Sequence, residues 1–535
     1  MSSFKKIHVK GSIHLGHQRE LIQAPVEREA PVMVMDAAGP RHEFDATTPF
    51  DDTGLGQALA FRLGTETLDE LAIVDDGLVT SFGIFGAPGS GKTVLLLYLL
   101  EQLMRHQAAD PAKRYGALIL DPKAALVDDV TAMAERAGRR DDLRIIGDGS
   151  ELNVIDCGLD PYELGSILVL AGRSAGIDAS DPFWFQEWSN LFACALSVLR
   201  AKAVIDPGIS GPAPVTLAQL VDALFMESAG RREIQHVARE LRARIGELSP
   251  AQQGDLLVDI RDLDRFYRSQ YVATVEAFIS KAFGMFRRSR LRHYSVNAGR
   301  ARGSAPFYED IIENGRIVLV SVPPSEPVLA KTLCTLVKCL FQRTVLARGD
   351  LLASGAITND LRPLVIACDE YSEIASEVPG QSMGDGQFLA LARQYGCMAL
   401  FATQSVNVLE ASSLKESWRS VFSNFAAKIY MRLADNDTAE EATKLAGESD
   451  WRVLNQGSSV GGQGYGASKQ RDLRERKNLP STILTQVLKR SEAVVIGALD
   501  GGQTTPGTRF LKVPDREAAR TPAARSSPAL RRARA

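Results

Sequence analysis

The chain has 535 residues, of which 45% are hydrophobic and 24% are charged, and its formal net charge is −3. This length exceeds what one hydrophobic core can organise and predicts about two or three domains. The near-neutral balance excludes a polycation that binds nucleic acid by bulk charge, so any contact with DNA must come from local basic patches.

The first informative motif follows a mixed N-terminal region. Residues 1–70 combine short apolar pieces with Pro, Gly and acidic residues, and they predict a small, partly irregular region. Residues 81–85 then read as a short buried strand, and residues 94–100 as part of an apolar helix. The pattern G-x-x-x-x-G-K-[ST] stands between them, formed by Gly86, Ala87, Pro88, Gly89, Ser90, Gly91, Lys92 and Thr93.

This octapeptide predicts a P-loop that binds ATP. Its glycines let successive backbone N–H groups turn around an anion, and the N-terminus of the following helix adds its positive dipole end. Lys92 would reach the β- and γ-phosphates, and the Thr93 hydroxyl would bind Mg²⁺. An ordinary Gly/Ser/Pro turn is the alternative, which the complete pattern between strand and helix disfavours.

The chain then continues as a βαβ unit that a helical region interrupts. Residues 115–120 predict a second strand, which ends in Asp121-Pro122-Lys123, and residues 143–146 predict a further one. Residues 179–305 show helical periodicity and many charges, and they predict an all-α insertion. The spacing supports this, because the two nucleotide motifs lie about 270 residues apart, whereas a minimal P-loop core needs on the order of 60–100.

The second nucleotide motif follows where the core resumes. Residues 316–322 predict a strand and residues 327–348 a helix. The apolar residues 364–368 predict a buried strand, and Asp369 and Glu370 emerge at its C-terminal end, where open α/β sheets bind ligands. Asp369 would hold Mg²⁺, and Glu370 would orient and deprotonate the attacking water. A strand end with a solvated acidic turn is the alternative.

A third strand carries a candidate sensor of the γ-phosphate. Residues 397–402 are apolar and lead into Thr403, Gln404 and Ser405. The Gln404 amide can hydrogen-bond the γ-phosphate and register its loss. A simple transition from strand to loop is the alternative.

The remaining segments complete the predicted core. Residues 426–431 and 493–497 predict two more strands. The glycine-rich residues 457–466 between them predict a surface hairpin or, alternatively, a second nucleotide contact. The Ala/Pro/Arg-rich residues 513–535 predict a disordered tail that contacts DNA or an acidic partner, or serves only solubility.

Two further features restrict the cellular setting. The six cysteines show no CxxC pair and no metal-like spacing with histidines, which is typical of small core residues in a reducing compartment. Neither an N-terminal signal nor a run of about 18 uncharged apolar residues occurs. We therefore expect a cytoplasmic protein, or one bound peripherally at the inner face of the bacterial inner membrane.

An ordered series of motifs resembles one known family. The P-loop is followed by Asp121-Pro122-Lys123 and Asp181-Pro182-Phe183-Trp184. Cys368-Asp369-Glu370-Tyr371 and Ala402-Thr403-Gln404-Ser405 come next, and residues 434–447 and 474–480 complete the series. This series, within residues 70–512, resembles the conjugative coupling proteins of type IV secretion, the TraG/TraD family within the HerA/FtsK ATPases. In two respects the sequence departs from it: many members begin with two transmembrane helices, and their Asp-Pro-Lys usually continues with Gly and an acidic residue instead of Ala124-Ala125.

The resemblance implies an α/β fold with a RecA-like P-loop core and a mostly parallel sheet. Its two parts would be residues 71–178 and 306–512, interrupted by the all-α domain 179–305. It also implies a homo-oligomer, a hexameric ring with ATP at the subunit boundaries, that moves DNA towards a secretion channel. Relaxosome and type IV secretion channel proteins are the expected partners.

Such a ring needs two further sets of residues. Arg419 and Arg432 are candidates for an arginine finger from the neighbouring subunit, although each is individually more typical of a surface ion pair. The basic-aromatic run with Arg287, Arg288, Arg290 and Arg292 is a candidate contact to DNA phosphates, with a solvated helix face as the alternative.

Three functions remain open from the sequence. The first is an ATP-hydrolysing, DNA-translocating motor of a conjugation apparatus. The second is a soluble HerA-like motor in DNA repair or phage defence. The third is a substrate-recruiting adaptor that uses nucleotide as a switch with little turnover, against which Glu370 weighs because a switch needs no general base.

Overall fold

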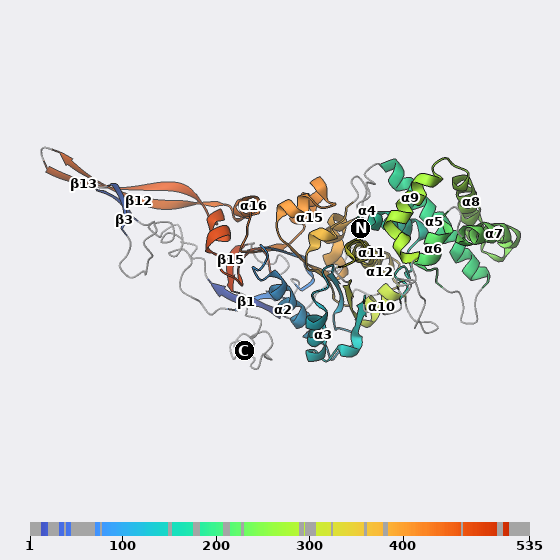
Figure 1. The fold of residues 1–535 in the computed structure, drawn as a ribbon. Coiled ribbons are helices and arrows are strands. Elements are labelled where there is room, and N and C mark those ends of the chain that lie inside the picture. The colour runs from blue at the N-terminus through green and yellow to red at the C-terminus, as the bar shows by residue number, and fades with distance from the viewer. Residues whose placement is uncertain are drawn as a thin grey trace.

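We describe a computed structural model of the chain (Figure 1). The described residues are 12–19, 32–36, 39–43, 70–74, 78–147, 152–174, 182–206, 214–225, 229–287, 294, 306–322, 325–357, 361–377, 384–461, 464–499 and 507–512.

The centre of the molecule is a sheet with seven neighbouring parallel strands. Their order is β11-β5-β10-β9-β6-β8-β7. Their bounds are Ala427–Met431 for β11, Phe82–Phe85 for β5, Cys397–Thr403 for β10, Leu364–Cys368 for β9, Gly116–Asp121 for β6, Ile317–Ser321 for β8 and Leu143–Ile146 for β7. All of them coincide, within a residue or two at each end, with strands predicted from apolar runs, as expected for strands buried on both faces.

Antiparallel strands extend this sheet beyond β11. β14 (Glu492–Gly497), β15 (Gly507–Lys512), β1 (Ser12–Arg19) and β4 (Glu70–Val74) follow in that order. β14 was expected, whereas β15 was not. Strands from both ends of the chain therefore close the same edge of the sheet, and part of the predicted N-terminal region belongs to the core.

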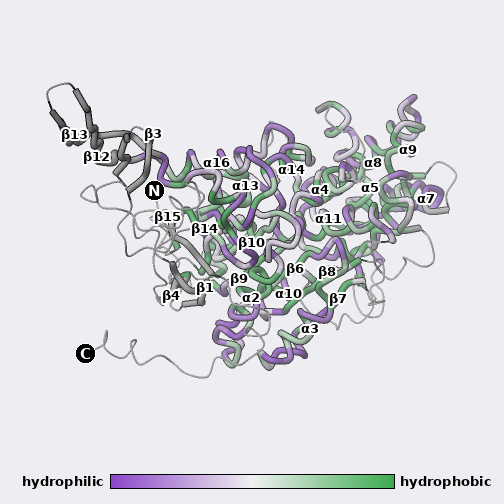
Figure 2. The backbone as a smooth tube through the Cα atoms, turned by 60° about the vertical axis from the view of Figure 1, so that its left-hand side comes forward, coloured by the Kyte–Doolittle hydropathy of each residue, from purple (hydrophilic) through white to green (hydrophobic). Residues whose placement is uncertain are grey.

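Helices cover both faces of the parallel strands, since alternate strand residues lie in two separate hydrophobic clusters. Ala117 and Ile119 of β6 pack with helices α2 (Lys92–Arg105) and α3 (Val127–Arg136), while Leu118 and Leu120 pack on the other side with α10 (Phe307–Asn314) and α11 (Pro327–Leu346). Each fully buried Val, Leu or Ile contributes about 1.5–3 kcal/mol. Hydrophobic residues accordingly follow the inner strands, and hydrophilic ones follow outer helices such as α16 (Asn436–Ala446) (Figure 2).

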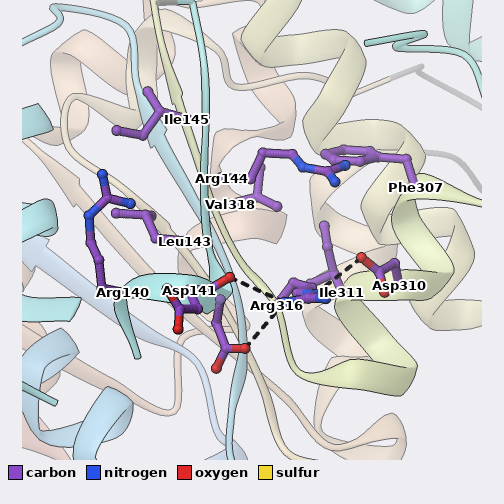
Figure 3. A pocket seen from close by; sticks show the side chains of 11 residues that line it. Arg140, Asp141, Leu143, Arg144, Ile145, Phe307, Asp310, Ile311, Arg316 and Val318 are labelled. Carbon is purple, nitrogen blue, oxygen red and sulfur yellow. Dashed lines mark hydrogen bonds and ion pairs between the residues drawn. The ribbon is translucent and has the colours of Figure 1, made fainter. Parts of the chain in front are cut away.

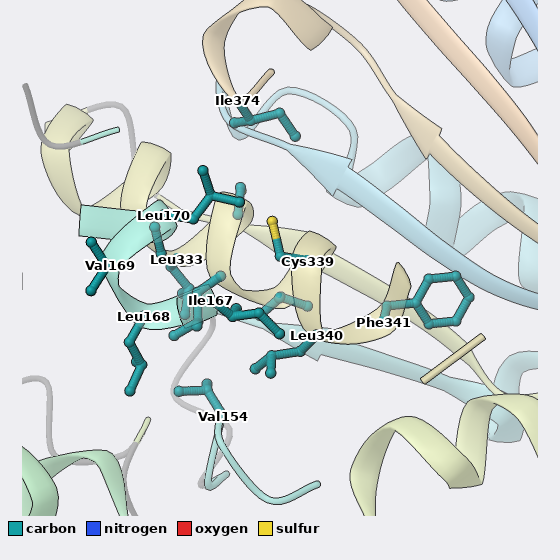
Figure 4. Close-up of a cluster of buried hydrophobic side chains, with 14 of the residues drawn as sticks. Val154, Ile167, Leu168, Val169, Leu170, Leu333, Cys339, Leu340, Phe341 and Ile374 are labelled. Carbon is teal, nitrogen blue, oxygen red and sulfur yellow. The ribbon is translucent and has the colours of Figure 1, made fainter. Parts of the chain in front are cut away.

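A group of helices stands at one end of the molecule (Figure 1). It comprises α5 (Pro182–Ile205), α6 (Leu217–Ala223), α7 (Ala229–Arg244), α8 (Pro250–Tyr267) and α9 (Val272–Phe283). α4 (Pro161–Ser174) packs between this group and α11, through apolar side chains such as Ile167, Leu170 and Leu333 (Figure 4). The chain leaves the sheet after β7 and returns at β8, and the elements described between these two strands are helices, in agreement with the predicted insertion.

Within the described ranges, one helical stretch, Phe183–Ile205, is long and apolar enough to cross a membrane, and half of its most apolar 18-residue window is buried inside the protein. This helix packs against α4, α7 and α8. Core helices of soluble proteins satisfy the same criterion, so it is weak evidence for a membrane span.

A long hairpin projects from the opposite end of the molecule (Figure 1). Its strands are β12 (Glu448–Gly461) and β13 (Gly464–Lys477), and β12 also pairs with β2 (Val32–Asp36), which pairs with β3 (Gly39–Glu43). Of the glycine-rich stretch, residues 457–461 and 464–466 lie at its outer end, far from the P-loop helix α2 (Figure 1). The hairpin was expected from the sequence; its length was not. A nucleotide contact from this stretch within the same chain is not supported.

Shorter helices connect the later strands. They are α12 (Arg348–Ala353), α13 (Asp385–Leu391), α14 (Val406–Glu410) and α15 (Trp418–Ser423).

Candidate nucleotide and magnesium site

The P-loop joins β5 to α2 and is anchored to the ends of two neighbouring strands. The Gly86 amide donates to the Thr403 carbonyl at 3.3 Å, and the Ala87 amide donates to the Arg432 carbonyl at 2.8 Å. Gly89 and Gly91 have φ of 75° and 110°, in the left-handed region that glycine tolerates. The loop is therefore held at its base while its tip takes a conformation that other residues adopt at a cost.

The start of the loop has room only for a glycine. A Cβ added at Gly86 would lie 2.6 Å from Ser90 Oγ and 2.9 Å from Met431 Cβ. The loop thus curls tightly upon itself, which gives the cradle of backbone groups that an anion needs.

Lys92 is buried and lies inside the loop. Its Nζ donates to the carbonyls of Gly86 at 2.7 Å and Ala87 at 3.3 Å. Burial lowers the pKa of this ammonium, and the nearby carboxylates of Glu370 and Asp369 counteract the shift. Phosphate oxygens can replace the two carbonyls as acceptors, which is the function predicted for this lysine.

The two distant motifs meet at one hydrogen bond. Thr93 Oγ1 donates to Asp369 Oδ2 at 2.7 Å, across 276 residues of sequence. Asp369 follows β9 directly, and the strand order places β10 between β9 and β5. The hydroxyl and the carboxylate that were predicted to bind one metal ion are therefore in contact.

The Asp369 carboxylate fits a magnesium ion. Its second oxygen, Oδ1, is buried and has no hydrogen-bond partner, although buried polar atoms are normally satisfied. Burial raises the pKa of Asp369, and the Thr93 hydroxyl partly opposes this shift. An unpartnered carboxylate oxygen beside a threonine hydroxyl is a suitable oxygen donor set for Mg²⁺.

Glu370 is held by two polar side chains from other segments. Its Oε1 lies 2.7 Å from Lys123 Nζ, and its Oε2 accepts from Gln404 Nε2 at 3.1 Å. Burial alone would raise the pKa of Glu370, but the bonds from Lys123 and Gln404 outweigh it and hold the pKa below the ordinary value. The carboxylate is therefore ionised at neutral pH, as a general base requires.

Lys123 is the member of this site that sequence reasoning did not assign. The motif Asp121-Pro122-Lys123 was noted, but no partner could be given to it. Asp121 Oδ2 instead accepts from the Leu126 amide at 2.7 Å and from Ser321 Oγ at 3.2 Å, so it shapes the turn before α3. The signal available in the sequence was that the motif ends a parallel strand near β9.

The other predicted residues lie in three situations. The side chains of Arg419 and Arg432 are exposed, with the Arg419 guanidinium 4.8 Å from the centre of the Trp418 ring. Arg432 contacts the P-loop of its own chain through its backbone carbonyl, which accepts from the Ala87 amide. The prediction for Arg287, Arg288, Arg290 and Arg292 falls on side chains outside the described part of the chain. All six cysteines are buried and free, as expected.

Apart from the nucleotide site, a pocket lies at the far edge of the sheet, beside β7 and α10 (Figure 3). Arg316 there lies 3.4 Å from Asp142 and 3.4 Å from Asp310, while the Arg144 guanidinium lies over the Phe307 ring at 5.8 Å. Its positive and negative side chains balance one another, and β7 is the third strand beyond β9. This pocket is separate from the nucleotide site.

Comparison with known proteins agrees with this arrangement. Residues 363–488 match the family model described as the TraM recognition site of TraD and TraG. That segment contains β9, β10 and β11, with Asp369, Glu370 and Gln404. No curated protein matches the chain.

Several solved structures share the fold. The bacterial conjugative coupling protein TrwBdeltaN70, in an unbound form, is 15% identical with a TM-score of 0.51, covering 84% of this chain and 88% of that chain. The plasmid coupling protein TrwB with the non-hydrolysable ATP analogue ADPNP is 13% identical with a TM-score of 0.54 and the same coverage. TrwB with ADP and Mg²⁺ is 15% identical with a TM-score of 0.51, covering 83% of this chain and 89% of that chain. The RecA-like fold of the conjugative coupling proteins is therefore the fold of this chain, and its residues 363–488 carry the sequence pattern of TraD and TraG, which confirms the TraG/TraD resemblance.

Proposed function

We propose that this chain is an ATP-hydrolysing, DNA-translocating motor that delivers DNA to a type IV secretion apparatus. The observation that carries the proposal is the contact between Thr93 and Asp369, with Glu370 ionised beside them. A site that only binds nucleotide needs the P-loop and a metal-binding oxygen. A site that also cleaves it needs a base, and Glu370 supplies one.

The residues of the site divide the reaction among them. The P-loop amides and Lys92 would bind the phosphates of ATP, and Thr93 and Asp369 would hold Mg²⁺, which neutralises charge on the phosphate oxygens. Glu370 would accept a proton from the attacking water, and Gln404, which bonds Glu370, would hydrogen-bond the γ-phosphate as its sensor. Since Lys123 and Gln404 both bond Glu370, its carboxylate is fixed before substrate arrives.

The oligomer and the DNA contacts belong to the same proposal. An arginine from a neighbouring subunit, Arg419 or Arg432, would stabilise the transferred phosphate, and such a finger is worth about 10³–10⁵ in rate. Both side chains are exposed and hence available to a second copy. DNA would be gripped through its phosphates, largely independently of sequence, with the run from Arg287 to Arg292 as the candidate contact. The relaxosome and the secretion channel would be the protein partners.

Glu370→Gln tests the proposal. We expect the variant to bind ATP with unchanged affinity and to lose turnover by roughly 10²–10⁴-fold, because only the general base is removed. Glu373→Gln is the matched control, since Glu373 lies three residues further on the same segment, in an exposed pair with Lys331. ATP hydrolysis is measured with and without single- and double-stranded DNA, and the native mass is measured in parallel.

The outcomes separate the three candidate functions. Turnover stimulated by DNA, lost in Glu370→Gln and retained in Glu373→Gln, supports a motor. ATP binding with negligible turnover in every variant supports the adaptor instead. Stimulation by DNA without any binding to relaxosome or secretion proteins supports the soluble motor of repair or defence.

A further inference from the structure

A fully buried ion pair contacts the turn that follows Glu370. Lys338 of α11 and Asp385 at the start of α13 are both 0% exposed, and Lys338 Nζ lies 2.6 Å from Asp385 Oδ2. Burying two charges costs several kcal/mol per ion unless the geometry and the additional hydrogen bonds compensate. The contacts of the pair therefore indicate why the fold retains it.

Asp385 accepts hydrogen bonds from four donors, which lie in two segments. Its Oδ2 accepts from Lys338, from Tyr371 Oη at 2.6 Å and from the Ser376 amide at 2.8 Å, and its Oδ1 accepts from Gln342 Nε2 at 2.9 Å. Two of these donors, Tyr371 and Ser376, belong to the turn that follows Glu370. The carboxylate therefore ties this turn to α11.

Lys338 completes the same connection from the other side. Its Nζ also donates to the Ile374 carbonyl at 2.7 Å and to Ser376 Oγ at 2.9 Å. All three protons of the ammonium thus have acceptors, and two of the acceptors lie between residues 371 and 376. α11 itself is fixed by apolar packing against α4 (Figure 4).

The turn so anchored begins at Glu370. Glu370 has φ of 63°, a left-handed conformation that costs a non-glycine residue about 1–2 kcal/mol. The next residue, Tyr371, stacks its ring on Phe401 of β10 at 4.3 Å and 8°. Since β10 leads into Gln404, the Tyr371 ring connects the segment of the base with the segment of the sensor. Such strain persists only where the surroundings enforce it.

We propose that Asp385 and Tyr371 are positioning residues for ATP hydrolysis: the Asp385 carboxylate, neutralised by Lys338, holds Tyr371 and thereby fixes the backbone of Glu370 and the direction of its carboxylate. Among the described hydrogen bonds, neither side chain bonds a residue that is predicted to bind nucleotide or magnesium. The inference rests on the proposed hydrolysis and adds the residues that set the geometry of the base.

Tyr371→Phe is the sharpest test, because it removes one hydroxyl and keeps the ring that stacks on Phe401. We expect kcat to fall by roughly 10- to 100-fold, since a misplacement of about 1 Å has effects of this size. The KM for ATP and the affinity for a non-hydrolysable ATP analogue should stay within about twofold, because the P-loop is untouched.

Tyr308→Phe is the matched control. Tyr308 is also fully buried, and its hydroxyl makes one hydrogen bond, to the Val154 carbonyl at 2.7 Å, away from the nucleotide site. The control removes the same group from the core and should lower the melting temperature without lowering kcat. Equal kcat values in Tyr371→Phe and Tyr308→Phe, at wild-type level or equally reduced, would overturn the proposal.

Asp385→Asn provides the second variant. The amide keeps the shape of the side chain but leaves Lys338 without its counter-charge, so we expect a larger loss of kcat together with a lower melting temperature. If Asp385→Asn folds and retains the wild-type kcat, the proposal is also overturned. An inactive wild type would instead contradict the proposed function, so the two failures are distinguishable.

Discussion

The ion pair between Lys123 and Glu370 leads to a prediction about the pH dependence of ATP hydrolysis. Lys123→Met removes the ammonium that lies 2.7 Å from Glu370 Oε1 and keeps a side chain of similar length. In the wild type, the pKa of Glu370 lies below its ordinary value of 4.5, because Lys123 and Gln404 outweigh the effect of burial. In the variant, burial still raises the pKa while the strongest opposing group is gone.

The size of the shift follows from the exposure of the pair. The Lys123 side chain is 53% exposed and the Glu370 side chain 13%. Solvent screens such a pair, so its interaction is worth about 1 kcal/mol, the upper end of the range for surface pairs. The loss of this pair removes the strongest group that opposes burial, so we expect the pKa of Glu370 to rise in Lys123→Met.

The sign for activity follows from the role of the group. A general base must be ionised, so kcat falls as the pH drops through its pKa. The acid limb of the kcat profile should therefore move to higher pH in Lys123→Met, and the rate near pH 5 should fall relative to the rate at pH 7.5. The profile is measured at saturating ATP and Mg²⁺.

Lys331→Met is the control for this experiment. Lys331 of α11 lies 2.5 Å from Glu373, which follows Glu370 by three residues. Among the described interactions, Lys331 has no contact with Glu370. Its profile should match that of the wild type. An unchanged acid limb in Lys123→Met would refute the assignment of Glu370 as the base whose charge Lys123 stabilises.

Three further predictions concern single groups. Thr93→Ala should abolish Mg²⁺-dependent hydrolysis and Thr93→Ser should restore most of it, because the serine hydroxyl can replace the donor to Asp369; a similar rate in both variants would contradict the metal site. Gln404→Ala should lower kcat by roughly 10²–10³-fold with little change in ATP affinity, as expected when one preorganised donor is removed, and a change in KM alone would contradict the sensor role. Ala124 has φ of 53°, so Ala124→Gly should raise the free energy of unfolding by about 0.5–1 kcal/mol in urea denaturation. Ala125→Gly is the control, and equal effects of the two glycines would contradict the strain at position 124.

The parallel core was predictable because its sequence signals are local. Each central strand is a short apolar run, and the P-loop and Asp369 each follow such a run directly, at the edge where parallel strands place ligands. Thr93 and Asp369 could therefore be assigned to one site although 276 residues separate them. The insertion could be predicted from this separation, because the βαβ units of a minimal P-loop core do not need so many residues between the two motifs.

The supporting contacts could not be predicted, because they depend on tertiary arrangement. Lys338 lies in an apolar helix, and nothing in its spacing indicates that it meets Asp385, 47 residues later. Lys123 reaches Glu370 only because β6 and β9 are neighbours in the sheet. The strands at the ends of the chain were missed for a similar reason, because they are defined by pairing with β14 and with one another.

The position of β10 explains why three separate motifs act as one site. β10 pairs with β5 on one side and with β9 on the other, so that Thr403 is level with Phe85 and Phe401 with Cys368. Gly86, Asp369 and Gln404 each follow these strands by one residue and therefore emerge at one edge. The helical insertion lies between β7 and β8 in the chain, and these two strands are the last in the parallel part of the sheet, on the side away from β5. The residues predicted to bind nucleotide therefore follow β5, β9 and β10, whereas the helical insertion follows β7, and α4 and α11 are the helices that connect the two regions.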